Sequence, residues 1–164
     1  MNGSRRINRA RQTRIARQSN RFVRRRPRSQ RAWSRLHARL YRLTRGHFLP
    51  RWFAGAPVMV LETVGRRSGK PRSSPVLYFR DGEALIVMAA NAGADRNPDW
   101  FLNLREAGEG TAVIGRERQR VKARVLEGAE RERAYRAFAD GYPQAEDYAG
   151  FTSRQLPLVR LVPS

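Results

Sequence analysis

The sequence predicts an α+β domain with about six mainly antiparallel strands and two or three helices, preceded by a basic N-terminal arm. From residue 57 onward, short β-branched and apolar runs alternate with Gly-containing turns, as in a β-meander. The charge is also divided unevenly. Residues 1–61 hold 17 Arg and no Asp, Glu or Lys, whereas residues 62–164 hold 17 Lys plus Arg against 14 acids. The net charge of +20 therefore belongs mostly to an attached arm, and the folded domain is expected over residues 55–164.

The predicted strands cover residues 58–64, 73–80, 84–90, 111–115, 119–126 and 158–162. Asp81-Gly82 is a typical two-residue hairpin turn, and residues 119–126 alternate apolar with basic side chains. Helices are expected over residues 98–107, where Pro98 suits the first turn, and over residues 129–140. Sequential hairpins of this kind favour a barrel-like sheet.

The arm contains two segments of different composition. Residues 1–31 are rich in Arg, Asn, Gln and Ser and carry few apolar side chains, which predicts disorder. In residues 32–54, Trp33, Leu36, Leu40 and Leu43 recur at helical spacing, which predicts a basic amphipathic helix and a linker. Through residues 1–45 the arm would suit an anionic membrane surface or, as a less favoured alternative, nucleic acid.

Composition also limits location and chemistry. The chain has no Cys, which excludes disulfides and thiolate chemistry. No apolar stretch approaches the roughly 18 to 20 residues of a membrane span, and Arg5-Arg6 is not followed by the apolar segment of an export signal. We therefore expect a cytoplasmic protein, which the arm would hold at the inner face of the membrane.

The most distinctive local feature is the basic turn, residues 65–72, between the first two predicted strands. It combines four cations, a hydroxyl and two glycines, a composition suited to a phosphate or polycarboxylate. A solvated hairpin turn is the alternative. The turn is not a nucleotide P-loop, because only three residues separate its glycines and Pro71 follows Lys70.

Two further features are candidates for a site. A Gly-containing loop, residues 91–97, leads into a helix whose first amides would face an anion or a ring carbonyl, although Trp100 and Leu104 equally suit a core. Tyr142 has a hydroxyl that can orient or protonate an acceptor. With an ordinary pKa of about 10 it is a weak acid, and a structural Tyr is the alternative. Both histidines precede the domain, which excludes a His-based metal site within it.

Taken in order from residue 57 to residue 163, these segments resemble the deazaflavin-dependent nitroreductase family, split β-barrel proteins that use coenzyme F420. The resemblance implies a split β-barrel over residues 55–164. It also implies an F420H2-dependent oxidoreductase that transfers hydride to a small conjugated acceptor such as a quinone, a nitro compound or an enone. The alternatives are a split barrel that binds FMN and a coenzyme carrier without turnover. The oligomeric state stays open.

The resemblance also implies roles for particular residues. The phosphate and glutamate tail of the coenzyme would be held by Arg66, Arg67, Ser68, Lys70 and Arg72. The deazaflavin and its linker would be lined by Pro75, Val76, Leu77, Met88, Ala89, Ala90, Asn91, Asp99, Trp100 and Asn103. Tyr142 would be the catalytic side chain on the substrate side of the ring. Relatives often have Ser at the position of Ala90, and some have a second Tyr at that of Ala145, so contacts with the acceptor are expected to differ.

Overall fold

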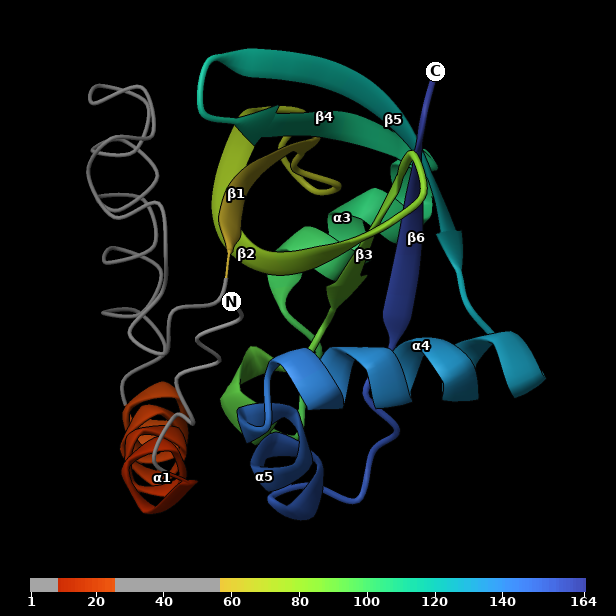
Figure 1. Ribbon diagram of the computed structural model, residues 1–164. Coiled ribbons are helices and arrows are strands. Elements are labelled where there is room, and N and C mark those ends of the chain that lie inside the picture. The colour runs from red at the N-terminus through yellow and green to blue at the C-terminus, as the bar shows by residue number, and fades with distance from the viewer. Residues whose placement is uncertain (1–8, 26–56) are drawn as a thin grey trace.

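The computed structural model describes residues 9–25 and 57–164, and its centre is a closed six-stranded barrel (Figure 1). The strands are β1 (Val58–Val64), β2 (Pro71–Asp81), β3 (Ala84–Met88), β4 (Glu109–Ile114), β5 (Glu117–Val125) and β6 (Leu158–Pro163). Around the barrel they follow the order β1-β2-β3-β6-β5-β4, and β4 pairs again with β1. Every neighbouring pair is antiparallel. The predicted barrel-like fold is confirmed, with strand limits that differ by a few residues at most.

The barrel interior is one of two apolar cores. Met59, Leu61, Val87 and Leu161 are among its fully buried members, and they come from strands on different sides of the barrel. Helix α3 (Asp99–Ala107) packs against β1, β4 and β5, and its Phe101 and Leu104 are buried in the same core. The barrel therefore holds α3 rigidly, and α3 carries part of the predicted site.

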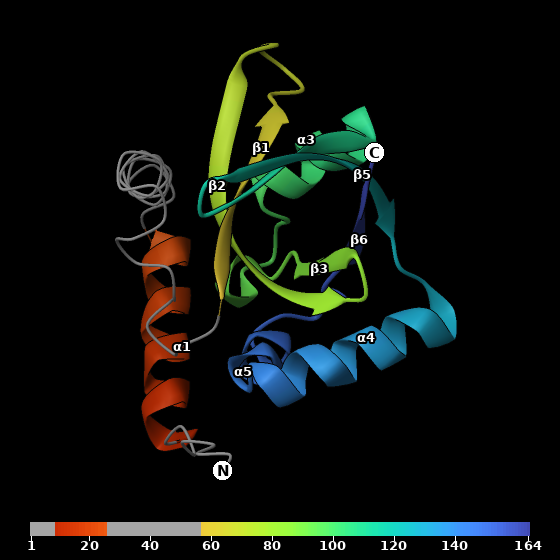
Figure 2. The same ribbon diagram turned by 45° about the horizontal axis from the view of Figure 1, so that its top comes forward.

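The second core lies outside the barrel, between it and the helices. Figure 2 shows α4 (Gly128–Gly141) and α5 (Gln144–Gly150) together at one end of the molecule, with α1 (Arg9–Arg25) at their side. A 3₁₀ turn, η1 (Asn91–Gly93), contacts both α1 and α5. The buried residues that these elements contribute are Ala16, Phe138, Ala139, Tyr142, Ala145 and Tyr148. Helix α5 was not predicted, because seven residues with two acids carry little helical periodicity.

The prediction of disorder for residues 1–31 is wrong for α1, Arg9–Arg25. Its few apolar side chains cannot form a core alone, but Ala16 and Val23 are buried against the rest of the protein. Thr13 donates to Asp147 of α5, and Asn20 Nδ2 donates to the Ala92 carbonyl over 2.8 Å. Contacts with the rest of the protein therefore stabilise a helix that the composition of this segment alone does not predict. The amphipathic helix predicted within residues 32–54 lies outside the described residues.

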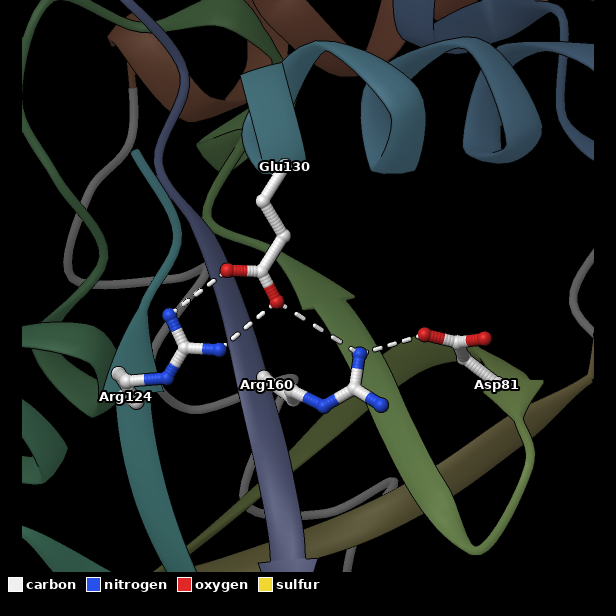
Figure 3. Close-up of polar contacts among 4 residues, drawn as sticks. All are labelled: Asp81, Arg124, Glu130 and Arg160. Atoms are coloured by element: carbon white, nitrogen blue, oxygen red, sulfur yellow. Dashed lines mark hydrogen bonds and ion pairs between the residues drawn. The ribbon is translucent and has the colours of Figure 1, made fainter. Parts of the chain in front are cut away.

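An ion-pair network attaches the first turn of α4 to the barrel (Figure 3). Glu130 accepts two hydrogen bonds from Arg124 of β5, at 2.8 and 2.7 Å. Arg160 of β6 lies 3.8 Å from the same carboxylate and also pairs with Asp81. The hydrogen bonds from Arg124 lower the pKa of Glu130. The network fixes the start of α4, whose other end is followed directly by Tyr142.

Candidate functional site

A cavity of about 1320 Å³ opens between the barrel and the helices. Its lining comes from α1, the basic turn, β2, the end of β3, the loop before α3, and the region of α4 and α5. Fourteen of the sixteen predicted site residues line it, namely Arg66, Arg67, Ser68, Arg72, Pro75, Val76, Leu77, Met88, Ala90, Asn91, Asp99, Trp100, Asn103 and Tyr142. Two are not among its lining residues: Lys70, which is exposed, and Ala89, which is buried in the barrel core.

The basic turn folds tightly around a glycine. Gly65 N donates to Lys70 O over 2.9 Å, and Ser68 N donates to Gly65 O over 3.0 Å. A Cβ on Gly65 would lie 2.8 Å from Ser68 Oγ and would collide with it. Ser68 Oγ in turn accepts a hydrogen bond of 3.1 Å from Arg72. This compact backbone presents Arg67, Lys70 and Arg72 to solvent together.

Asn103 connects the basic turn to α3. Its side-chain oxygen accepts from the Arg66 amide at 3.2 Å and from the Arg66 guanidinium at 3.1 Å. Its amide group donates to Thr63 Oγ1 at 3.4 Å, and both Asn103 and Thr63 are buried. Arg66 is also 3.8 Å from Asp99, at the start of α3. The basic turn and α3 are therefore joined by hydrogen bonds. In this structure the side chain of Asn103 binds and holds the basic turn.

Cations in this turn remain available to a ligand. Within residues 9–25 and 57–164, no carboxylate forms an ion pair with Arg67, Lys70 or Arg72. Elsewhere on the barrel, exposed arginines such as Arg118 and Arg120 pair with Glu62 and Glu109. The unneutralised charge in the turn suits an anionic ligand.

Strand β2 forms a wall that joins the basic turn to an apolar end. From Arg72 to Leu77 the strand rises by about 17 Å, at roughly 3.3 Å per residue. Leu77 packs against the core shared by the helices, which also contains Met88 and Phe138. Figure 2 shows the β1–β2 turn and the pair α4 and α5 at opposite ends of the molecule. The cavity therefore has one charged end and one apolar end.

Tyr142 lies at the apolar end in an aromatic cluster. Its ring is 6.1 Å from that of Phe138 and 6.4 Å from that of Tyr148. The hydroxyl of Tyr142 donates to Gln144 Oε1, and the hydroxyl of Tyr148 hydrogen bonds with Tyr142 and with Ser19 of α1. Burial, followed by the influence of Tyr148, raises the pKa of Tyr142 above the ordinary value of 10. Tyr142 is thus a neutral hydroxyl whose proton is already engaged.

Sequence reasoning missed the contribution of α1. The helix lines the cavity with Ile15, Gln18, Ser19, Phe22 and Val23. A helical spacing of four and then three residues, from Ile15 to Ser19 to Phe22, was the available signal. Also missed were Ser73 and Ser74 of β2, Ala92, Arg96 and Asn97 of the loop before α3, and Phe138 and Tyr148 at the apolar end.

These residues fit a long coenzyme with an anionic tail. The cavity is larger than the roughly 300 to 1,000 Å³ typical of a pocket for one small ligand, so it has room for a coenzyme and an acceptor. The basic turn is compact because Gly65 has no side chain, and its cations are not neutralised by carboxylates. Such a turn suits phosphate and carboxylate groups of a ligand. Edge-to-face aromatic side chains and aliphatic side chains at the other end suit flat rings.

Comparisons with known proteins agree with this description. The family model described as F420H(2)-dependent quinone reductase matches residues 33–163. An F420H(2)-dependent quinone reductase from Mycobacterium tuberculosis H37Rv is 30% identical over 130 residues, which are 77% of this chain and 87% of that protein. Its counterpart from strain CDC 1551 has the same identity and coverage.

Solved structures give the same result for the fold. The structure described as an F420-H2 dependent reductase (FDR-A) has a TM-score of 0.59 and 26% identity, and the match covers 64% of this chain and 93% of that one. Another chain, described as a domain-swapped dimer, is 24% identical with a TM-score of 0.61 over 77% of this chain and 96% of its own length, and shows the fold alone. The barrel, the two-ended cavity and the family match lead to one conclusion: this chain belongs to the F420H(2)-dependent quinone reductase family.

Proposed function

We propose that this protein reduces a quinone with F420H2, with the coenzyme tail in the basic turn and the reacting ring toward the apolar end. The observation that carries the proposal is the single cavity that joins the two ends. A site for a charged coenzyme alone would need only the turn, and a site for an apolar acceptor alone would need only the aromatic cluster. Nitro compounds and enones are the other acceptors of the same chemical type.

In this proposal, the basic turn binds and orients. Arg67, Lys70 and Arg72 hold the phosphate and glutamate groups by charge-assisted hydrogen bonds. Arg66 is held by Asn103 and Asp99. It therefore contributes both a positive charge and a contact that fixes the shape of the turn. Remote binding of this kind places the reacting ring without contacting it.

At the apolar end the protein supplies a surface of buried aromatic and aliphatic side chains. Reduced F420 would supply the hydride, and the reduced quinone then needs one proton. Because the pKa of Tyr142 is raised and its hydroxyl donates to Gln144, Tyr142 is a poor acid. We propose that the ring of Tyr142 positions the acceptor by aromatic contact, and that water at the cavity mouth supplies the proton.

The direct experiment follows oxidation of F420H2 by a soluble quinone on addition of the purified full chain. We expect turnover that depends on both reactants, and no turnover when NADPH or reduced FMN replaces F420H2. A protein that retains FMN on purification, or turns over equally well with FMNH2, would support the FMN-binding alternative instead. Binding of F420 without turnover of any quinone, nitro compound or enone would support the coenzyme carrier.

We further propose that the outer face of α1 holds the enzyme at an anionic membrane surface, from which an apolar quinone is accessible. Arg14, Arg17 and Arg21 are exposed on one face of the helix, while Ala16 and Val23 are buried on another. Since these side chains are cations, the attachment would be electrostatic and reduced by salt. A search of the described helices finds none that could span a membrane.

Deleting residues 1–31 would be a poor test, because α1 lines the cavity. The better test replaces Arg14, Arg17 and Arg21 with Gln and measures sedimentation with vesicles of phosphatidylcholine and phosphatidylserine. The matched control replaces Arg116, Arg133 and Arg136, which are exposed in the β4–β5 turn and on α4, with Gln. We expect the first variant alone to lose vesicle binding. Equal vesicle binding by both variants would contradict this proposal. If the α1 variant instead keeps vesicle binding and loses only nucleic-acid binding, the nucleic-acid alternative is favoured.

A further inference from the structure

We propose that Arg154 is a positioning residue that fixes the pocket loop, residues 89–97, in the shape in which it lines the coenzyme cavity. Its effect on the coenzyme rests on the proposed function, whereas its effect on the loop does not. Arg154 lies between α5 and β6, almost sixty residues from the loop in sequence. It is not among the cavity-lining residues and therefore acts through the loop.

The guanidinium of Arg154 uses all three nitrogens on the pocket loop. Nε donates to Ala94 O over 2.8 Å, and Nη1 donates to Asn97 Oδ1 over 2.7 Å. Nη2 donates to the carbonyls of Ala89 and Ala90, at 3.1 and 2.6 Å. One side chain thus connects both ends and the middle of the loop.

The loop needs such support because its backbone is unfavourable. Asn91 and Ala92 have φ angles of 49° and 53°, in the left-handed region that side chains disfavour, and Gly93 follows at 72°. These three left-handed residues make only the short 3₁₀ turn η1, where Gly93 N donates to Ala90 O and Ala94 N donates to Asn91 O. The contacts of Arg154 span this segment from both sides.

The loop in turn forms a wall of the cavity. Ala90, Asn91, Ala92, Arg96 and Asn97 all line it. Asn97 and the carbonyl of Ala90 are direct partners of Arg154, so a shift of the guanidinium would move two points of this wall.

The hydrogen-bond acceptors of Arg154 on the pocket loop are neutral groups. Desolvation lowers the pKa of Arg154, with only a partly compensating influence from Asp95. Its described partners are carbonyl oxygens and an amide, which accept from a planar fork of donors that Lys does not have.

The test compares the full-length variants Arg154→Ala and Arg154→Lys with Arg131→Ala. Arg131 is a matched control: its side chain is only 11% exposed, it donates to the Leu156 carbonyl, and none of its described contacts is with the pocket loop. The readouts are the Kd of F420, the KM of F420H2 and kcat, and hydrogen exchange of the amides of Gly93 and Ala94.

We expect Arg154→Ala to raise Kd and KM at least about tenfold, with kcat at saturation within about threefold, and to speed exchange at Gly93 and Ala94. Arg154→Lys should recover part of the affinity, and it serves as the test variant if Arg154→Ala does not fold. Arg131→Ala should lower stability but leave Kd within about twofold. Unchanged exchange and wild-type Kd in Arg154→Ala would overturn the proposal. If the wild type binds no F420, the proposed function fails, and exchange at Gly93 and Ala94 still decides the role of Arg154.

Discussion

The two ends of the cavity use different physics. At the basic turn, Arg67, Lys70 and Arg72 are exposed and project from a small hydrogen-bonded backbone. At the apolar end, Tyr142 and Tyr148 are only 4% and 6% exposed and belong to the core that holds the helices. The turn can therefore lose binding without losing the fold, whereas the apolar end cannot be changed without disturbing both.

The largest difference is expected from removing charge at the turn. The triple variant carries Arg67→Gln, Lys70→Gln and Arg72→Gln. Its Kd for F420 should rise about 100-fold, a loss of about 2.7 kcal/mol of binding free energy, because three charge-assisted contacts are lost. The free energy of unfolding should change by less than about 1 kcal/mol, since the side chains are exposed. Calorimetric titration and urea unfolding measure the two quantities.

Arg116→Gln, Arg133→Gln, Arg136→Gln removes equal charge elsewhere and is the control. If both triple variants lower the affinity for F420 equally, only the net charge of the protein matters and the turn is not a specific site.

A smaller effect, with the opposite pattern, is expected from Gly93→Ala. A Cβ there would lie 2.6 Å from the Tyr148 carbonyl, and φ is +72°. The closeness of η1 and α5 would be lost, so the free energy of unfolding should fall by about 2 kcal/mol. Gly141→Ala, with no atom within 4 Å of its Cβ, should change stability by less than about 1 kcal/mol. Equal stability of the two variants in urea would show that the apolar end tolerates change as the turn does.

The smallest effect is a pH dependence at the apolar end. Burial raises the pKa of Tyr142, so the folded state favours its neutral form, and the unfolded chain ionises first, near pH 10. Stability from this group is complete below pH 10 and is lost as the pH rises further. At pH 11 the wild type should have lost about 1.4 kcal/mol more than Tyr142→Phe, relative to pH 8.5. Parallel losses in urea unfolding at the two pH values would argue against a buried, neutral Tyr142.

The sequence was most informative about the barrel and the turn. Alternation in residues 119–126 and the Asp81-Gly82 turn are local signals, and the structure has a strand and a hairpin there. The basic turn was equally visible, because its charge and glycines are contiguous.

The sequence was least informative where distant segments meet. Helix α1 is polar almost throughout and forms a cavity wall only because α5 and η1 complement its narrow apolar face. Arg154 looked like any surface arginine, since its four acceptors lie about sixty residues away and three of them are backbone carbonyls. No local pattern encodes such partners.

The most direct test of the two-ended site is calorimetric titration with F420 and with the same deazaflavin lacking the phosphate and glutamate tail. Each titration is made at about 50 mM and about 500 mM salt, so that screening is changed strongly. The account predicts that intact F420 binds about 100-fold more tightly at low salt, and that the difference narrows at high salt because only the tail is held by charge. Equal affinities at low salt would contradict the account.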